Sequence, residues 1–168
     1  RIQPLAKIKQ QIIDAADERG IGTTQRRTRH QLRQLSAEAA VLLLANLGHW
    51  LPQLQSAGLI TLAGDVDGGG LWAQIAWPDL DAALHADDIS GNIGELRVLR
   101  TAASIADGQH IDLGDVAANI DRRALTLVLA AIAHAGGSHG DRDITHDAEG
   151  VPRAGKPLPP LIAWPTHG

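Results

Sequence analysis

Four residue types are missing from this chain: cysteine, phenylalanine, tyrosine and methionine do not occur among its 168 residues. Without cysteine the chain cannot form a disulfide, use a thiol nucleophile or hold a metal through thiolates, which favours a cytoplasmic setting. Its aromatic residues are four tryptophans, so the core has to be built mainly from Leu, Ile, Val and Ala. Small aliphatic side chains and alanine-rich segments of high helix propensity predict a mostly helical fold.

A long hydrophobic stretch is also lacking. The longest apolar run, residues 37–47, contains Glu38 and Asn46 and is too short to cross a bilayer. The first residues show no signal-peptide pattern. We therefore expect a cytoplasmic protein without a membrane partner, and its length suits one domain or one compact domain with an appendage.

Positive charge is absent from the middle of the chain. Residues 1–34 carry eight Lys and Arg against three acidic residues, whereas residues 34–96 contain eight acidic residues and not one Lys or Arg. A basic segment attracts phosphate and an acidic one repels it. This asymmetry indicates an anionic partner for the N-terminal part, although the overall net charge is −4.

Residues 50–77, WLPQLQSAGLITLAGDVDGGGLWAQIAW, are predicted to form a short helix ended by Gly58, a strand over 59–63, a glycine-rich turn and a second strand over 71–77. Upstream we expect helices over 4–19 and 25–35, and a third that Ser36 caps and that runs to Leu47. This order resembles the second half of a winged-helix domain. The resemblance implies a winged-helix-like N-terminal lobe over residues 1–86, with a small β-hairpin.

The basic second helix is the predicted nucleic-acid surface. Its candidate phosphate contacts are Arg26, Arg27, Arg29 and Arg33, because guanidinium groups match phosphate oxygens; a solvated helix face would look the same. In winged-helix proteins the helix before the wing often enters the major groove, and Gln53 and Gln55 on that helix could read adenine. Asp65 and Asp67 stand in the wing where cations are usual, so the basic helix is the better DNA-binding candidate.

The C-terminal half is predicted to be helical over 95–106, 113–119 and 122–135, with caps at Asp112 and Asp121. We expect Leu125, Val128, Leu129 and Ile132 to form the buried stripe of the last helix, with Leu127 widening it. Residues 115–133 also loosely resemble a helix-turn-helix, but the second helix is apolar, which favours a helical hairpin packed on the core. The predicted lobe is therefore 95–137, packed on the N-terminal lobe.

Residues 138–168, rich in Gly, Asp, His and Pro, are expected to form an extended tail that straps onto this chain or onto a neighbouring copy. Its apolar anchors would be Leu158, Leu161, Ile162 and Trp164. Together with Trp72 and Trp77 of the hairpin, Leu161 and Trp164 are the candidate interface residues, which a homo-oligomer or another protein would cover.

One group of residues could hold a metal or perform chemistry: His134, His139, Asp141, Asp143, His146 and Asp147. Histidine and carboxylate are suitable ligands, but the spacing matches no established pattern, and a hydrated charged loop explains the group better. No nucleophile motif or phosphate-binding loop occurs elsewhere. We expect no enzyme, no cofactor and no metal site.

Two hypotheses follow from the sequence. The first is a small DNA-associated regulatory or adaptor protein, acting in transcription regulation, that uses the basic helix for phosphate contacts with double-stranded DNA. The second is a non-enzymatic interaction or assembly subunit, in which the acidic winged-helix-like surface and the C-terminal tail bind another chain.

Overall fold

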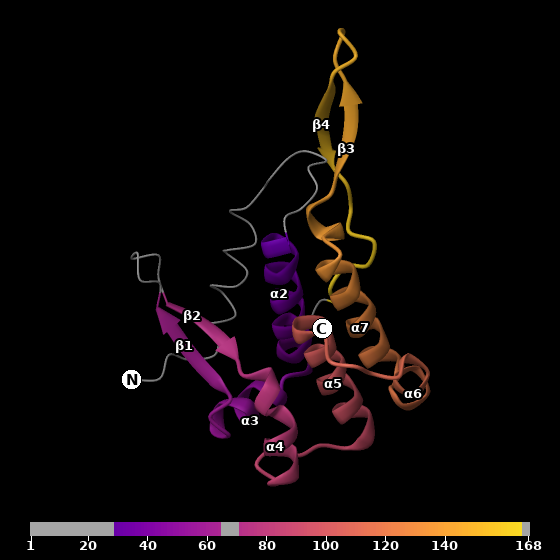
Figure 1. Ribbon diagram of the computed structural model, residues 1–168. Helices are drawn as coiled ribbons and strands as arrows, with labels where there is room; N and C mark the ends of the chain where they lie inside the picture. The colour runs from indigo at the N-terminus through magenta and orange to yellow at the C-terminus, as the bar shows by residue number, and fades with distance from the viewer. Residues whose placement is uncertain (1–28, 65–70, 166–168) are drawn as a thin grey trace.

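The computed structural model describes residues 29–64 and 71–165, and it is mostly helical with two small antiparallel strand pairs (Figure 1). The predicted fold class is confirmed. In chain order the elements are α2 (Arg29–Leu47), α3 (Trp50–Ser56), β1 (Ile60–Gly64), β2 (Leu71–Ile75), η1 (Trp77–Asp79), α4 (Leu80–His85), α5 (Ile93–Asp107), α6 (Leu113–Asn119), α7 (Arg122–Ala135), η2 (Ser138–Gly140), β3 (Arg142–His146) and β4 (Pro152–Pro157). The helix expected over 4–19 lies outside the described residues.

Helix α2 differs from the prediction. Two helices separated at Ser36 were expected, but one helix runs without a break from Arg29 to Leu47. Ser36 therefore lies inside a helix and does not cap one. No proline or glycine interrupts this segment, and the buried positions Ala39, Ala40, Leu43 and Leu44 repeat at helical spacing, so tertiary packing favours continuation. The helix ends where expected, at Gly48, whose φ is +86°.

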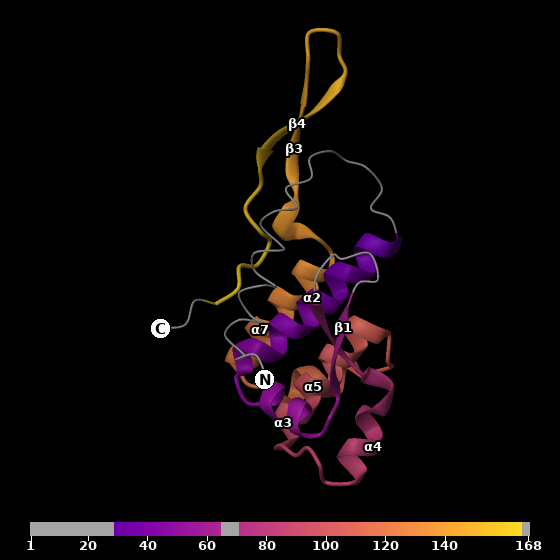
Figure 2. The ribbon, with the colours of Figure 1, turned by 90° about the vertical axis from the view of Figure 1, so that its left-hand side faces the viewer.

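The core lies where α2 packs against α5 and α7 (Figures 1 and 2). Small residues dominate these contacts, and alanines are completely or almost completely buried on all three helices. They include Ala39, Ala40, Ala102, Ala103, Ala130 and Ala131. Because alanine lets helix backbones approach closely, a core without Phe, Tyr or Met can still be dense. One hydrophobic cluster joins residues of both predicted lobes.

Local sequence signals set most helix ends. Asn92 and Glu95 form a reciprocal capping box at the start of α5, and Gly108 follows that helix with φ +75°. Asp112 accepts hydrogen bonds from the backbone N–H groups of Gly114 and Asp115 at α6, as expected. Asp121 accepts one from Ala124 at 2.7 Å and caps α7, as expected. These caps give α5, α6 and α7 their predicted positions.

The hairpin after α3 also follows the prediction. Gly58 adopts φ +72°, and the N–H of Leu59 returns to the carbonyl of Leu54 at 2.9 Å, which closes the helix. Strand β1 then pairs antiparallel with β2, with Ile60 opposite Ile75. The link between these strands, including Asp65 and Asp67, lies outside the described residues.

The segment after α7 is not wholly the extended tail that was expected. Strands β3 and β4 form an antiparallel hairpin, with Ile144 opposite Ala154, that projects from one end of the helical body (Figures 1 and 2). Its turn is held by Asp147, whose carboxylate accepts from the N–H groups of Glu149 and Val151, and by Gly150 at φ +78°. Pro152 and Pro157 stand at the two ends of β4. Because proline is uncommon in strands, the sequence of this segment resembles coil and did not predict a strand.

The buried stripe of α7 was also predicted incorrectly in part. Val128 is buried, but Leu125, Leu129 and Ile132 are exposed, and the inner side consists of Ala124, Leu127, Val128, Ala130, Ala131 and His134. Three of these six inner residues are alanines, which allow α7 to approach α2 closely, whereas Leu125, Leu129 and Ile132 face outward. No helix within residues 29–64 and 71–165 is long and apolar enough to span a bilayer.

Candidate functional site

The arginine-rich end of α2 lies at the same end of the molecule as the β3–β4 hairpin (Figures 1 and 2). Arg29 begins the helix and Arg33 is exposed one turn later, while Arg26 and Arg27 lie outside the described residues. The first turn of α2 contains no acidic residue. Arg29 and Arg33 therefore give the first described turns of α2 two positive charges and no negative charge before Glu38.

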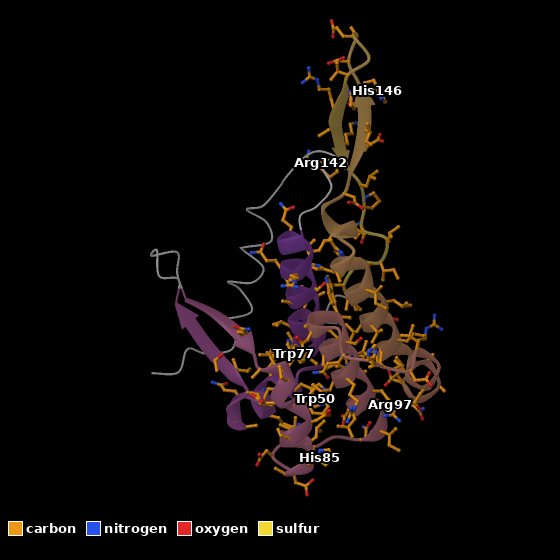
Figure 3. The ribbon with its side chains drawn as sticks, viewed as in Figure 1. Trp50, Trp77, His85, Arg97, Arg142 and His146 are labelled. Atoms are coloured by element: carbon orange, nitrogen blue, oxygen red, sulfur yellow. The ribbon has the colours of Figure 1, made fainter. Side chains whose placement is uncertain are left out.

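The opposite end of the molecule is acidic. It is formed by α3 and α4, and it exposes Asp79, Asp81, Asp87 and Asp88. Asp81 pairs with Arg100 at 3.1 Å, but no Lys or Arg belongs to the described segments from 35 to 64 and from 71 to 96. Figure 3 marks the two ends, with His85 at the acidic end and Arg142 and His146 on the hairpin. Of the eight cations of residues 1–34, Arg29 and Arg33 belong to the described part of the chain, and they lie at the end of α2 opposite this acidic surface.

The two glutamines predicted to read bases lie on α3, near the acidic end. The side-chain oxygen of Gln53 accepts a hydrogen bond from the backbone N–H of Ser90 at 2.9 Å, which ties α3 to the loop before α5. Gln55 is half-buried on the same helix. The structure does not bring these glutamines together with Arg29 and Arg33.

The four candidate interface residues have different surroundings. Trp77, which Figure 3 labels together with Trp50, is buried in the core of its own chain. Leu161 is 83% exposed. Trp164 is half-buried and packs against the core cluster, so the tail is anchored on this chain. Trp72 is the second residue of β2, after Leu71, and its side chain lies outside the described part of the structure.

Trp164 contacts a cluster of titratable side chains whose association was not predicted from the sequence. Its indole N–H donates to His134 Nδ1 at 3.3 Å, and the rings of His134 and His139 lie 4.8 Å apart between centroids. On the other side, His134 Nε2 lies 3.7 Å from Glu38 Oε2. Because Nδ1 accepts the tryptophan proton, the proton of neutral His134 must sit on Nε2, facing Glu38.

His134 is buried, Glu38, His139 and Trp164 are half-buried, and the cluster is only partly hydrogen-bonded. Glu38 Oε1, His134 Nε2 and His139 Nε2 are inaccessible to solvent and have no hydrogen-bond partner. Burial lowers the pKa of His139, the neighbouring His134 lowers it further, and Glu38 opposes the shift. Desolvation therefore favours a neutral imidazole at His139, as expected for a histidine held beside a second histidine.

The predicted group of histidines and aspartates is divided by the fold. His134 and His139 join the cluster that Trp164 contacts, Asp143 and His146 lie on the exposed strand β3, and Asp147 holds the hairpin turn. No three His, Asp or Glu side chains within the described residues are placed to hold a metal ion. Sequence reasoning missed Glu38, which stood out only as one charge inside the apolar run 37–47.

A shallow groove of about 450 Å³ lies on another face, between the end of α5, the loop that follows it and α7. It is mainly apolar, with Ile105, Ile111, Leu113 and Ile132 among its lining residues. No pair of catalytic side chains opens into it, since its only titratable lining residue is His110. The groove is suited to apolar contact and not to chemistry.

Comparison with known proteins gives no relative: no family model, no curated protein and no solved structure matches the chain.

Proposed function

We propose that this chain is a small, non-enzymatic, DNA-associated regulatory or adaptor protein of the cytoplasm that contacts backbone phosphates through the start of α2. The observation that carries the proposal is the separation of charge along the molecule. The basic start of α2 lies at one end and the acidic surface of α3 and α4 at the other. A polyanion would be attracted to the first end and repelled from the second.

The start of α2 has the groups that phosphate binding requires. Arg33 is exposed, Arg29 precedes it by one helical turn, and Arg26 and Arg27 adjoin them in the sequence. Guanidinium groups bind phosphate oxygens in protein–DNA complexes. Such contacts position a protein on DNA without selecting a sequence.

The position of the β3–β4 hairpin is a second reason to place the binding surface at this end of the molecule. A two-stranded ribbon fits the major groove of B-DNA, and this ribbon projects beside the start of α2 with Arg142, Arg153 and Lys156 on it. Acidic residues of the hairpin balance these cations, so the phosphate affinity has to come mainly from α2. The proposed docking does not use Gln53 or Gln55, because α3 lies toward the acidic end.

The test is fluorescence anisotropy with a labelled random-sequence duplex of about 25 base pairs, titrated at several salt concentrations. Wild-type affinity should fall steeply with salt, because each phosphate contact contributes about 0.9 to the log–log slope. Replacing Arg26, Arg27, Arg29 and Arg33 by alanine should nearly abolish binding at low ionic strength.

The matched comparison is Arg33→Ala against Arg100→Ala. Arg100 lies on α5, where it pairs with Asp81 of the acidic surface at 3.1 Å. Arg33→Ala should weaken binding and Arg100→Ala should not. Binding that is absent at low salt, or insensitive to salt, would contradict the proposal.

A second candidate function, that of a protein-interaction or assembly subunit, is favoured by one separate observation. Leu113, Leu125, Leu129 and Ile132 expose apolar surface beside the groove. A contiguous apolar surface of this kind marks an interaction site more often than an isolated exposed leucine does. In this case light scattering should detect an oligomer or a stable complex.

A further inference from the structure

The outward side of α7 is apolar along its length. Leu125, Leu129 and Ile132 are 38%, 42% and 47% exposed and follow one another at i, i+4 and i+7, so they share one helix face. Helix α7 contains no Asp or Glu, and Arg122 stands exposed at its first position. We call the three apolar side chains the α7 stripe.

The α7 stripe is continuous with the groove described above. Ile132 belongs to both, and Leu113, which is 65% exposed, lines the groove at the start of α6. A protruding row of side chains therefore stands directly beside a hollow of matching apolar character. Such a surface can pair with a copy of itself, because the row of one molecule can fill the hollow of the other.

We propose that the α7 stripe is the interface of a two-fold symmetric dimer of this chain, in which the two α7 helices pack antiparallel. With the axis near Leu129, Leu125 of each copy lies beside Ile132 and the groove of the other. A two-fold interface uses the same surface twice, which suits a patch that carries both the row and the hollow.

The distribution of charge around the α7 stripe supports a second copy of this chain as its binding partner. Arg122 lies at the N-terminal end of the stripe, whereas the exposed Asp107 adjoins Gly108 of the groove at the end marked by Ile132. Antiparallel packing brings Arg122 of each copy toward Asp107 of the other, so the pairing occurs twice. Parallel packing would place the two Arg122 side chains together, and like charges disfavour it.

Within residues 29–64 and 71–165, the rest of the fold leaves this face exposed. The β3–β4 hairpin projects beyond the end of α7, so the two hairpins of an antiparallel dimer would point away from each other (Figures 1 and 2). Trp164 binds His134 on the inner side of α7, and the stripe remains exposed with the tail in place. A stable interface needs about 800 Å² from each partner, so Leu113 and the groove rim must take part as well as α7.

The absence of cysteine from the chain gives a sharp test of the geometry. In a single-cysteine variant, Leu129→Cys, the two thiols would face each other at the axis and form a disulfide-linked dimer under mild oxidation. The control is Ile144→Cys on the hairpin, a residue of similar exposure at 45%, which should remain monomeric on a denaturing gel. Equal cross-linking of both variants, or of neither, would overturn the proposal.

The solution test uses sedimentation velocity and light scattering on the full chain from 1 to 200 µM. Wild type should approach twice the 17.7 kDa chain mass as the concentration rises. Leu129→Lys should raise the dimer dissociation constant at least ten-fold, while Ile144→Lys should leave it unchanged; circular dichroism confirms that both fold. A wild-type monomer at every concentration would assign the face to a different partner and overturn the dimer.

A charge exchange tests the antiparallel orientation separately from stability. Arg122→Glu alone should weaken the dimer several-fold, and Asp107→Arg alone should do the same. The double variant restores opposite charges across the axis and should recover most of the affinity. Failure of the double variant to recover, when both single variants weaken the dimer, would exclude this orientation.

Discussion

Trp164, near the end of the described chain, donates its indole N–H to Nδ1 of His134 in α7 at 3.3 Å. This contact fastens the segment that follows the β3–β4 hairpin to the helical body. It also fixes the tautomer of His134, since Nδ1 must accept and Nε2 must then carry the proton that faces Glu38. One hydrogen bond thus links the position of the tail to the tautomer of His134.

The first prediction concerns this anchor. Trp164→Phe keeps an aromatic ring but removes the N–H donor, so we expect a loss of about 1 kcal/mol in the free energy of unfolding. Trp164→Ala also removes apolar contact with the core and should cost about 2–3 kcal/mol. Urea denaturation measures both values.

Leu161→Ala is the matched control for this anchor, because Leu161 lies in the same tail but is 83% exposed. It should change the free energy of unfolding by less than about 0.5 kcal/mol. Equal effects of Trp164→Ala and Leu161→Ala would show that the tail is not anchored as described.

The second prediction concerns acid. Burial, helped by His134 and opposed by Glu38, lowers the pKa of His139 below its ordinary value of 6.5. The folded state then binds fewer protons than the unfolded state once the pH falls below this value. Stability should be complete above pH 6.5 and should decline as the pH falls from there through the folded-state pKa.

Thermal melts between pH 5 and pH 8 measure this decline. His139→Gln should flatten the pH dependence, whereas His146→Gln, on the exposed strand β3, should leave the dependence unchanged. An unaltered slope in His139→Gln would assign the acid sensitivity to other groups.

The third prediction concerns the contact between Gly91 and Trp50. A Cβ atom on Gly91 would lie 2.8 Å from a carbon atom of the Trp50 ring, which is completely buried and cannot move aside. Gly91→Ala should therefore overpack the core and cost about 1–3 kcal/mol of stability. Chemical denaturation measures the loss.

Gly136→Ala gives the comparison for this glycine. Gly136 has φ −70°, and the nearest atoms to an added Cβ lie at 3.5 Å or more, so alanine fits without strain. This variant should be neutral or slightly more stable than wild type, because alanine restricts the unfolded chain. If Gly91→Ala were equally well tolerated, the described position of Trp50 would be wrong.

The fourth prediction concerns the β3–β4 hairpin. The pKa of Asp147 is lowered mainly by the N–H of Val151, with further help from Arg153 and Glu149. The stabilising effect of this carboxylate is present above its ordinary pKa of 3.8 and is lost as the pH falls below that value. Hydrogen exchange should show hairpin amides losing protection in acid before those of α2.

Asp147→Asn tests the role of the charge at this turn. The amide oxygen can still accept from Val151, but the amide nitrogen that replaces Oδ2 cannot accept the 2.9 Å hydrogen bond from Arg153. The variant should have weaker hairpin protection at neutral pH and a smaller further loss in acid. Full protection in this variant at all pH values would contradict the assigned role.

Local chemistry was sufficient to predict much of the fold. Asp112 and Asp121 cap α6 and α7, and Gly58 and Gly108 end α3 and α5, because each signal acts through backbone atoms within a few residues. The helical content follows from the supply of alanine and leucine in the same way. The winged-helix resemblance and the DNA-binding role of Arg26, Arg27, Arg29 and Arg33 stay predictions.

Tertiary packing decided what the sequence left ambiguous. Helix α7 has apolar residues on nearly every side, so periodicity alone could not show that close contact with α2 would bury its alanines and expose Leu125, Leu129 and Ile132. Glu38 and His134 meet only because α2 and α7 lie against each other, far apart in the chain. The sequence by itself determined where most helices start and stop, since those signals are local, although packing carried α2 through the expected cap at Ser36. Only the tertiary structure decided which faces are buried, because burial depends on the neighbour that each helix finds.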